Sequence, residues 1–411
     1  MIKRRAFLAA WNLAICYALS AAPPAVNVPK TGMDPARLSQ IPGRMKAFVE
    51  KGTIPGVVTL VQRHGALASL EAVGYQDLES HKPMRTDTIF QIMSMTKPFT
   101  GVGIMILMEE GKLALSDPVE KYLPEFRGMS VIDHREGDRR ILRPPARKVT
   151  IRDLLTHTSG MYAKMPPALD PLENWMSKTL AEVVLIGSQQ PLDFDPGTKW
   201  QYSNIGIATA GRIIEVLADQ PYEKFLESRI FQPLGMRDSY LFPPPEKYER
   251  IAACYTLENG KLKLMGEDTL GGGRYRYRKG VRNPLPEGGL YSTASDLAAF
   301  YQMMLNGGML NGKRILSKAT VDLMTRVHTG DLKTANPGTS YGLSWSVVSD
   351  PMGSLALPLL STGSYGHGGA FGTYGWVDPK QDMVGVFLVQ RPSASDERNA
   401  FMSLAGSAIV D

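Results

Sequence analysis

The segment from Thr96 to Glu110 is apolar on nearly every side, and this constrains the fold more than any other feature of the chain. Residues 102–107 run Val-Gly-Ile-Met-Ile-Leu, and the glycine at 111 is typical of a helix end. A helix without a polar face is stable only when other elements pack around it. We therefore expect a buried helix that begins near Ser94, inside a core that a chain of 411 residues is long enough to form.

Strand-like patterns lie at both ends of the chain, around a mainly helical middle. The predicted strands are residues 57–61, 68–73, 343–348, 372–377 and 383–390, with an extended segment at 86–93, and the predicted helices are residues 151–155, 180–186, 205–218, 222–230, 294–305 and a last one from 396. This order predicts one α/β domain over residues 35–405. Its α/β part covers about 35–126 and 275–405, and an all-helical part covers about 150–270.

The distribution of charge argues against a nucleic-acid partner. The formal net charge is +6, but the N-terminal segment with Lys3, Arg4 and Arg5 carries no acidic residue, so the remaining chain has a charge of only +3. No long basic stripe accompanies this small excess. Residues 127–148 form an insertion that mixes both signs of charge with two prolines, and this pattern predicts a solvated excursion or hairpin rather than an anion-binding patch.

The first 22 residues have the pattern of an export signal. A basic start precedes a short apolar run at residues 6–19, and small residues at 18–22 offer cleavage sites. The pair Arg4-Arg5 is similar to the twin-arginine export consensus. The apolar run is shorter than the roughly 20 residues of a spanning helix. We therefore expect a periplasmic or secreted protein with no membrane span after cleavage; the alternative is an uncleaved N-terminal anchor.

Ser94 and Lys97 are the first candidate pair for chemistry. Three residues apart at a helix start, they lie one turn apart on the same face. Serine needs a base to become a nucleophile, and a lysine can be that base when burial and neighbouring positive charge lower its pKa. The helix dipole favours the same shift, and the Ser94 N–H can point at a developing oxyanion.

Two further motifs follow along the chain. Tyr202-Ser203-Asn204 precedes a helix, and a phenol near an ammonium can have a lowered pKa. Taken alone, however, the motif is better explained as a helix entry with Asn204 near the cap. His367-Gly368-Gly369 precedes a strand, and its glycines can leave backbone N–H groups free to face a ligand or can simply form a turn.

Taken in order, these three motifs resemble those of class C β-lactamases, related DD-peptidases and family VIII carboxylesterases. Tyr202 lies 108 residues after Ser94, and His367 lies 165 residues after Tyr202. Three supporting stretches match as well: residues 154–160, residues 233–236 and residues 288–293. The resemblance covers roughly residues 35–405 and implies the penicillin-recognition fold, an antiparallel sheet flanked by helices with an all-helical part.

The resemblance also implies roles for individual residues. Ser94 would be acylated, and Lys97 and Tyr202 would share the transfer of its proton. Asn204 would orient Lys97 and the substrate, with His367, Gly368 and Gly369 also lining the substrate site. The N–H groups of Ser94 and Ala370 would form the oxyanion hole.

The third motif departs from that of the β-lactamases, which have Lys-Thr-Gly there. His367 is mostly neutral at pH 7 and offers less to a drug's carboxylate than a lysine does. We therefore expect an exported carboxylesterase for short-chain acyl esters, a small-molecule substrate and no cofactor or metal; nothing in the pattern specifies an oligomer. The alternatives are a β-lactamase or DD-peptidase acting on amide bonds, and a penicillin-recognition sensor without turnover.

Other candidate residues have simpler explanations. Gly338-Thr339-Ser340-Tyr341-Gly342 matches the G-x-S-x-G motif of α/β-hydrolases, but that motif needs a strand before the serine and a helix after it. Here a turn-like stretch precedes Ser340 and a strand follows. The remaining histidines show no metal-binding spacing, and we expect His157 inside a hydrogen-bonded turn and Cys254 as a small buried residue.

Overall fold

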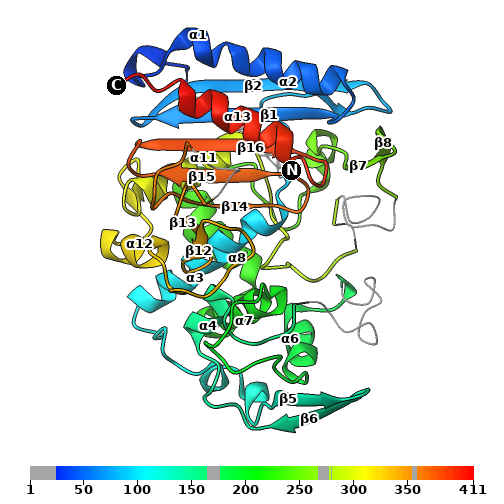
Figure 1. Ribbon diagram of the computed structural model, residues 1–411, viewed down its shortest axis with the longest axis vertical. Coiled ribbons are helices and arrows are strands. Elements are labelled where there is room, and N and C mark those ends of the chain that lie inside the picture. Colours follow the sequence, from blue (N-terminus) through cyan, green and yellow to red (C-terminus); the bar gives the residue numbers. More distant parts are fainter. Residues whose placement is uncertain (1–24, 164–175, 267–276, 279, 354–358) are drawn as a thin grey trace, which may run out of the picture.

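The computed structural model describes residues 25–163, 176–266, 277–278, 280–353 and 359–411 (Figure 1). The export signal predicted at residues 1–22 lies outside these residues. No helix in the described ranges combines the length and the apolar composition that a membrane crossing requires.

An eight-stranded antiparallel sheet forms the upper part of the molecule in Figure 1. Its strand order is β12-β13-β14-β15-β16-β1-β2-β3, so that strands from the two ends of the chain meet where β1 pairs with β16. The bounds are β1 Gly56–Arg63, β2 Ala66–Asp77, β3 Lys82–Pro83, β12 Thr339–Tyr341, β13 Ser346–Val348, β14 Tyr365–Gly368, β15 Tyr374–Asp378 and β16 Met383–Val389. The predicted fold class is confirmed.

Alternating side chains divide the sheet between two apolar clusters. Val57 and Val61 of β1 face one cluster together with residues of α2 (Gln40–Glu50) and α13 (Ser395–Ser407), which cover that face (Figure 1). Val58 and Leu60 face the main core on the other side. The period of two along the strand therefore determines which residues join each layer.

Helices pack beneath the sheet in Figure 1 around the buried helix that the sequence predicts. The buried helix is α3 Lys97–Glu109, and the others are α4 Ile151–Thr156, α6 Leu180–Ser188, α7 Asn204–Ala218, α8 Tyr222–Leu226, α9 Gln232–Leu234, α11 Ala294–Leu305 and α12 Lys318–Thr325. The short helix α1 Pro35–Leu38 instead contacts α2 and α13 on the opposite face. Residues 97–107 of α3 are all buried. At Gly103 a Cβ atom would lie 2.7 Å from Ile214 of α7, so glycine allows the two helices to approach closely. The prediction of a central apolar helix is confirmed.

The start of α3 differs from the predicted one. Ser94 lies in a separate 3-10 turn, Met93–Thr96, and α3 itself begins at Lys97. Pro98 is the reason, because proline lacks the N–H that a helix interior needs and is tolerated in a first turn. The helices α2 and α12 were not predicted; each is short and buries only two or three side chains.

Short ladders complete the structure: β4 Phe90–Gln91 with β9 Tyr291–Ser292, β5 Val131–Glu136 with β6 Arg139–Arg143, β7 Tyr255–Glu258 with β8 Lys261–Leu264, and β10 Met309–Leu310 with β11 Lys313–Arg314. The β5–β6 pair is the solvent-exposed hairpin that the mixed charges predict. The expectation of helices throughout residues 150–270 is wrong for the β7–β8 hairpin. Asn259 and Gly260 both have positive φ there, as a tight hairpin turn requires.

Candidate active site

Ser94 is the one residue between positions 88 and 107 that reaches the surface; the others are buried. The 3-10 turn that carries it is closed by the Thr96 hydroxyl, which donates to the Met93 carbonyl at 2.7 Å. The Ser94 Oγ lies 3.1 Å from the Lys97 Nζ, so the expected pair is formed within one turn of the chain. The fold thus exposes a single hydroxyl at the end of its central helix.

Lys97 is fully buried, and its amine has two hydrogen-bond partners in the described part of the chain. These are the Ser94 Oγ and the backbone carbonyl of Glu287, the latter at 2.7 Å. Burial lowers the pKa of Lys97 to about 7, against the opposing effect of the Glu287 carboxylate. The predicted direction of the pKa shift is right, but the neighbouring charge is negative where the sequence analysis considered a positive one.

Tyr202 stands in the loop before α7, with its phenol hydrogen-bonded to Ser94 and its ring 4.7 Å from the Lys97 Nζ. The expectation of a lowered phenol pKa is wrong. Burial raises the pKa of Tyr202 above its ordinary value and outweighs the hydrogen bond from Ser94. At neutral pH, Tyr202 is therefore an uncharged phenol that can relay a proton, and Lys97 is the group with a pKa suited to remove one.

Among the described residues, Asn204 makes no hydrogen bond to Lys97, the residue that the resemblance predicts it to orient. Its side chain is exposed on the first turn of α7, and the helix cap is Ser203, whose hydroxyl accepts from the Gly206 N–H. In the described part of the chain, the Glu287 carbonyl holds the amine of Lys97 instead. Asn204 is free to reach a bound substrate.

His367 is buried in β14 and is held neutral. Its Nδ1 lies 2.7 Å from the Gly368 carbonyl, and its Nε2 lies 2.9 Å from the Tyr341 hydroxyl. A carbonyl can only accept, so Nδ1 carries the proton and the Tyr341 hydroxyl donates to Nε2. Burial and the nearby Lys97 lower the pKa of His367 to about 3. The sequence prediction of a neutral His367 agrees with this geometry.

The turn after His367 is packed directly against the residues before Ser94. At Gly369 a Cβ atom would lie 2.2 Å from the Ile92 carbonyl oxygen, and the Thr373 hydroxyl donates to the same oxygen at 3.1 Å. The Gly369 N–H is not free for a ligand, as the sequence suggested, because it donates to the Thr373 carbonyl. Ala370 is exposed in this turn, near the segment that carries the Ser94 N–H.

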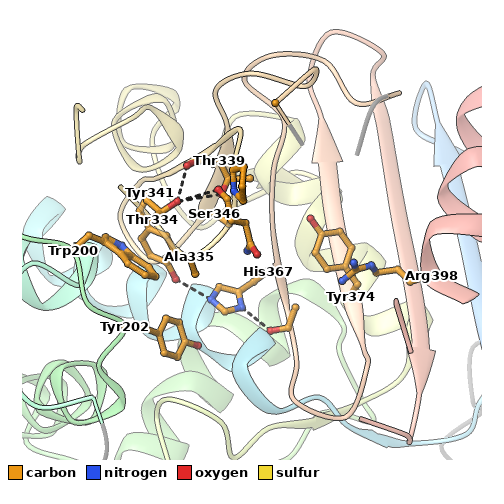
Figure 2. Close-up of a pocket in the computed structure, with 14 residues that line it drawn as sticks. Trp200, Tyr202, Thr334, Ala335, Thr339, Tyr341, Ser346, His367, Tyr374 and Arg398 are labelled. Carbon is orange, nitrogen blue, oxygen red and sulfur yellow. Dashed lines mark hydrogen bonds between the residues drawn. The ribbon is translucent and has the colours of Figure 1, made fainter. Parts of the chain in front are cut away.

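A cavity of about 520 Å³ opens beside Tyr202 and His367. Its wall also includes the aromatic side chains of Trp200, Tyr341 and Tyr374 and the guanidinium of Arg398 (Figure 2). Ser94 is not among the lining residues, but its hydrogen bond to Tyr202 places it next to the inner wall. The cavity provides a site for the acyl or alcohol group of a substrate.

The sequence analysis missed several of these residues. Tyr341 lies within the G-x-S-x-G stretch that was rejected, and Trp200 lies two positions before Tyr202. Their roles depend on contacts that no local pattern encodes. Glu287 directly precedes the matched stretch at residues 288–293, and an acidic residue next to two glycines was the available signal.

His157 and Ser340 have structural explanations. His157 ends α4 with a φ of 60°, and its Nδ1 accepts the Ser203 N–H at 3.1 Å, so it supports the loop that carries Tyr202. This agrees with the expected hydrogen-bonded turn. Ser340 is buried within β12 and β13 follows it, which is not the context of a nucleophile. Cys254 is buried as expected.

A serine beside a buried lysine, at the end of a central helix under an antiparallel sheet, defines a serine hydrolase of the penicillin-recognition fold. In line with this, the chain belongs to the Beta-lactamase family, whose sequence profile matches residues 42–406.

Several known proteins are similar to this chain over most of its length. The chain is 32% identical over 374 residues to Protein Rv1367c of Mycobacterium tuberculosis, across 84% of this chain and 88% of that protein. It is 29% identical over 362 residues to Esterase EstB of Burkholderia gladioli, across 79% of this chain and 82% of EstB. The solved structure of EstCE1, described as a hydrolase with promiscuous acyltransferase activity, matches with a TM-score of 0.77 and 25% identity, across 91% of this chain and 99% of that one.

Proposed function

We propose that this serine hydrolase is a carboxylesterase that cleaves short-chain acyl esters through an acyl-enzyme on Ser94. The Ser94 oxygen attacks the acyl carbon while its proton passes to the neutral amine of Lys97. As the tetrahedral intermediate collapses, the proton returns through Lys97 and Tyr202 to the leaving alcohol. Water then repeats the sequence, releasing the acid and restoring Ser94. The N–H groups of Ser94 and Ala370 stabilise the oxyanion in both steps.

The neutral state of His367 is the observation that carries the ester assignment. The lysine of β-lactamases at this position supplies a positive charge for the drug's carboxylate. Here both ring nitrogens of His367 are engaged by Gly368 and Tyr341, and protonation is disfavoured by burial. An ester of an uncharged short-chain acid needs no such charge, and the similarity to Esterase EstB supports the same substrate class.

Arg398 favours a second candidate, hydrolysis of an amide substrate that carries a carboxylate, such as a β-lactam or a D-amino-acid peptide. Its guanidinium lines the cavity, 5.0 Å from the centre of the Tyr374 ring. The side chain otherwise makes only long hydrogen bonds of 3.3–3.4 Å to Asn399 among the described residues. A carboxylate could therefore bind to Arg398 in place of the missing lysine.

A side-by-side assay with p-nitrophenyl butyrate and a chromogenic cephalosporin tests both candidates. We expect kcat/KM for the ester to exceed that for the cephalosporin by orders of magnitude. Arg398→Met is the matched variant, and it should leave ester turnover nearly unchanged. A cephalosporin rate at or above the ester rate, lost in Arg398→Met, would establish the second candidate. A stable acyl adduct without turnover of either substrate would indicate a sensor.

We also propose that the protein is exported and acts in the periplasm or outside the cell. The basic start, short apolar run and small residues of positions 1–22 support this. The test is fractionation of cells that express the full chain, with Edman sequencing of the mature N-terminus. Replacement of Arg4 and Arg5 by lysine should retain the protein inside the cell if the twin-arginine route is used. Export of an uncleaved chain would favour the N-terminal anchor.

A further inference from the structure

Residues 286–290 run along the first turns of α3 and are held there by hydrogen bonds. The Thr100 hydroxyl donates to the Pro286 carbonyl at 2.6 Å, and the Lys97 amine donates to the Glu287 carbonyl at 2.7 Å. The Leu290 N–H in turn donates to the Thr96 hydroxyl at 3.1 Å. Three consecutive contacts therefore fix the backbone of Glu287 directly behind the amine of Lys97.

The side chain of Glu287 is buried as well, with 9% of its surface exposed. Its Oε2 atom has no hydrogen-bond partner in the described part of the chain. The carboxylate interacts electrostatically with two buried cations, Lys97 and Arg278. It also acts on the phenols of Tyr162 and Tyr222 and on that of Tyr202. A buried carboxylate with an unpaired oxygen is costly unless nearby positive charge compensates it.

The other titratable groups around Lys97 are uncharged near neutral pH. Burial lowers the pKa of His157 and His367, so both imidazoles stay neutral. Burial raises the pKa of the three phenols and of Tyr341, so these side chains stay protonated. The groups among the described residues that can carry charge here are Lys97, Arg278, Glu287 and also Glu223, which acts on Arg278. Burial raises the pKa of both carboxyl groups.

Two cations compensate the buried carboxyl group of Glu287. Burial raises its pKa, and the charges of Lys97 and Arg278 oppose this increase. Burial lowers the pKa of Arg278, but only to about 10, so its guanidinium stays charged at neutral pH and favours the Glu287 carboxylate. The carboxylate in turn raises the pKa of Lys97, against the burial that lowers it.

We propose that Glu287 is a positioning residue that, together with Arg278, sets the proton affinity of the Lys97 amine from behind the active site. The Glu287 carbonyl holds the amine toward Ser94, and the carboxylate limits how easily the amine loses its proton. Arg278 acts in the same direction through Glu287, because its charge favours the ionised carboxylate. This role rests on the proposed function of Lys97 as the base that activates Ser94, and neither residue touches substrate.

The test measures how fast a fluorophosphonate probe labels Ser94 as a function of pH. The probe needs only an activated serine, so the result does not depend on the natural substrate; Ser94→Ala is the control for the labelled position. Glu287→Gln removes the negative charge and should move the acidic limb of the rate profile to lower pH by about one unit, the lower end of the effect of a close opposite charge. At pH 6 the labelling rate of Glu287→Gln, expressed as a fraction of its own plateau, should then be about five times that of the unmodified protein.

Two matched variants distinguish an electrostatic role of Glu287 from a purely structural one. Glu287→Asp keeps the carboxylate and should leave the limb closer to that of the unmodified protein. Arg278→Met removes the cation that favours the Glu287 carboxylate and should move the limb to lower pH, in the same direction as Glu287→Gln. A purely structural role would lower the plateau and the melting temperature of these variants without moving the limb.

An unmoved limb in folded Glu287→Gln, or shifts of opposite sign in Glu287→Gln and Arg278→Met, would overturn the proposal. Normal labelling without turnover of any ester would instead contradict the esterase assignment. Where a variant does not fold, the unmodified protein labelled with ¹³Cε-lysine carries the test. The Lys97 resonance, assigned by its loss in Lys97→Arg, should titrate in two steps because its charge depends on that of Glu287. A single step would overturn the proposal.

Discussion

Replacing Lys97 by arginine separates the charge of this side chain from its ability to lose a proton. Arginine stays protonated at any working pH, so Lys97→Arg keeps a cation beside Ser94 but cannot accept the serine proton. The buried position and the 3.1 Å contact with the Ser94 Oγ are the features that make this substitution informative.

The structure gives the size of the expected effect. An ordinary lysine with a pKa of 10.5 is neutral in only about one molecule in 3,000 at pH 7, whereas a pKa of about 7 makes roughly half of the molecules neutral. Loss of a positioned acid–base group lowers kcat by about a hundredfold or more. We therefore expect Lys97→Arg to lose at least that factor.

The assay is hydrolysis of p-nitrophenyl butyrate between pH 5 and pH 9, about two units on each side of the expected midpoint. Product is measured at its isosbestic wavelength, so that ionisation of the product does not distort the profile. For the unmodified protein, kcat/KM should rise with pH and reach half its maximum near pH 7, because the neutral amine is the active form. Lys97→Arg should lack this limb, with an unchanged circular dichroism spectrum. Near-normal kcat in this variant would show that charge at position 97 is sufficient and that Tyr202 alone removes the proton.

Three further predictions use the same preparations. Ser94→Ala should abolish turnover with the fold intact, whereas the buried Ser340→Ala should keep most activity; the reverse pattern in the ester assay would refute the assignment of the nucleophile. Tyr202→Phe removes the hydroxyl that contacts Ser94 and should lose about a hundredfold in kcat. Its loss should not add to that of Lys97→Arg in the double variant, since both serve one proton path. Finally, the unfolded chain binds the Lys97 proton more tightly than the folded one, so stability should rise between about pH 7 and pH 10.5. In calorimetry, Lys97→Met should melt at least about 2 °C higher than the unmodified protein at pH 7, and its stability should rise less with pH. A lower melting temperature of this variant would show that burying the amine is not costly.

Much of the fold could be predicted because its signals are local. The helix α11 has the predicted bounds, and β1, β2 and β16 were found by their apolar runs. The predicted secondary structure was wrong where the local sequence signal was weak or was overlooked. The strand β14 contains two glycines, which have low strand propensity, and the β7–β8 hairpin depends on the Asn259-Gly260 turn.

The same distinction between local and tertiary signals applies to the residues of the candidate site. Ser94 and Lys97 could be paired from their spacing, since a helical turn brings residues three apart together wherever it stands. The order of the three motifs then indicated the family and the other candidate residues. The phenol pKa of Tyr202 was predicted in the wrong direction, because its sign depends on how deeply the tertiary structure buries the ring.

The sequence by itself determined which side chains can react, because covalent chemistry and the spacing of a single turn are properties of the local chain. Only the tertiary structure decided the proton affinity of those groups. The Lys97 amine contacts a carbonyl 190 positions away, and its pKa depends on the loss of water and on the charge of Glu287. His367 is likewise neutral because burial in the folded protein lowers its pKa, and Tyr341, from another strand, occupies its second nitrogen. Electrostatic energies depend on distance and burial in three dimensions, and a linear pattern specifies neither.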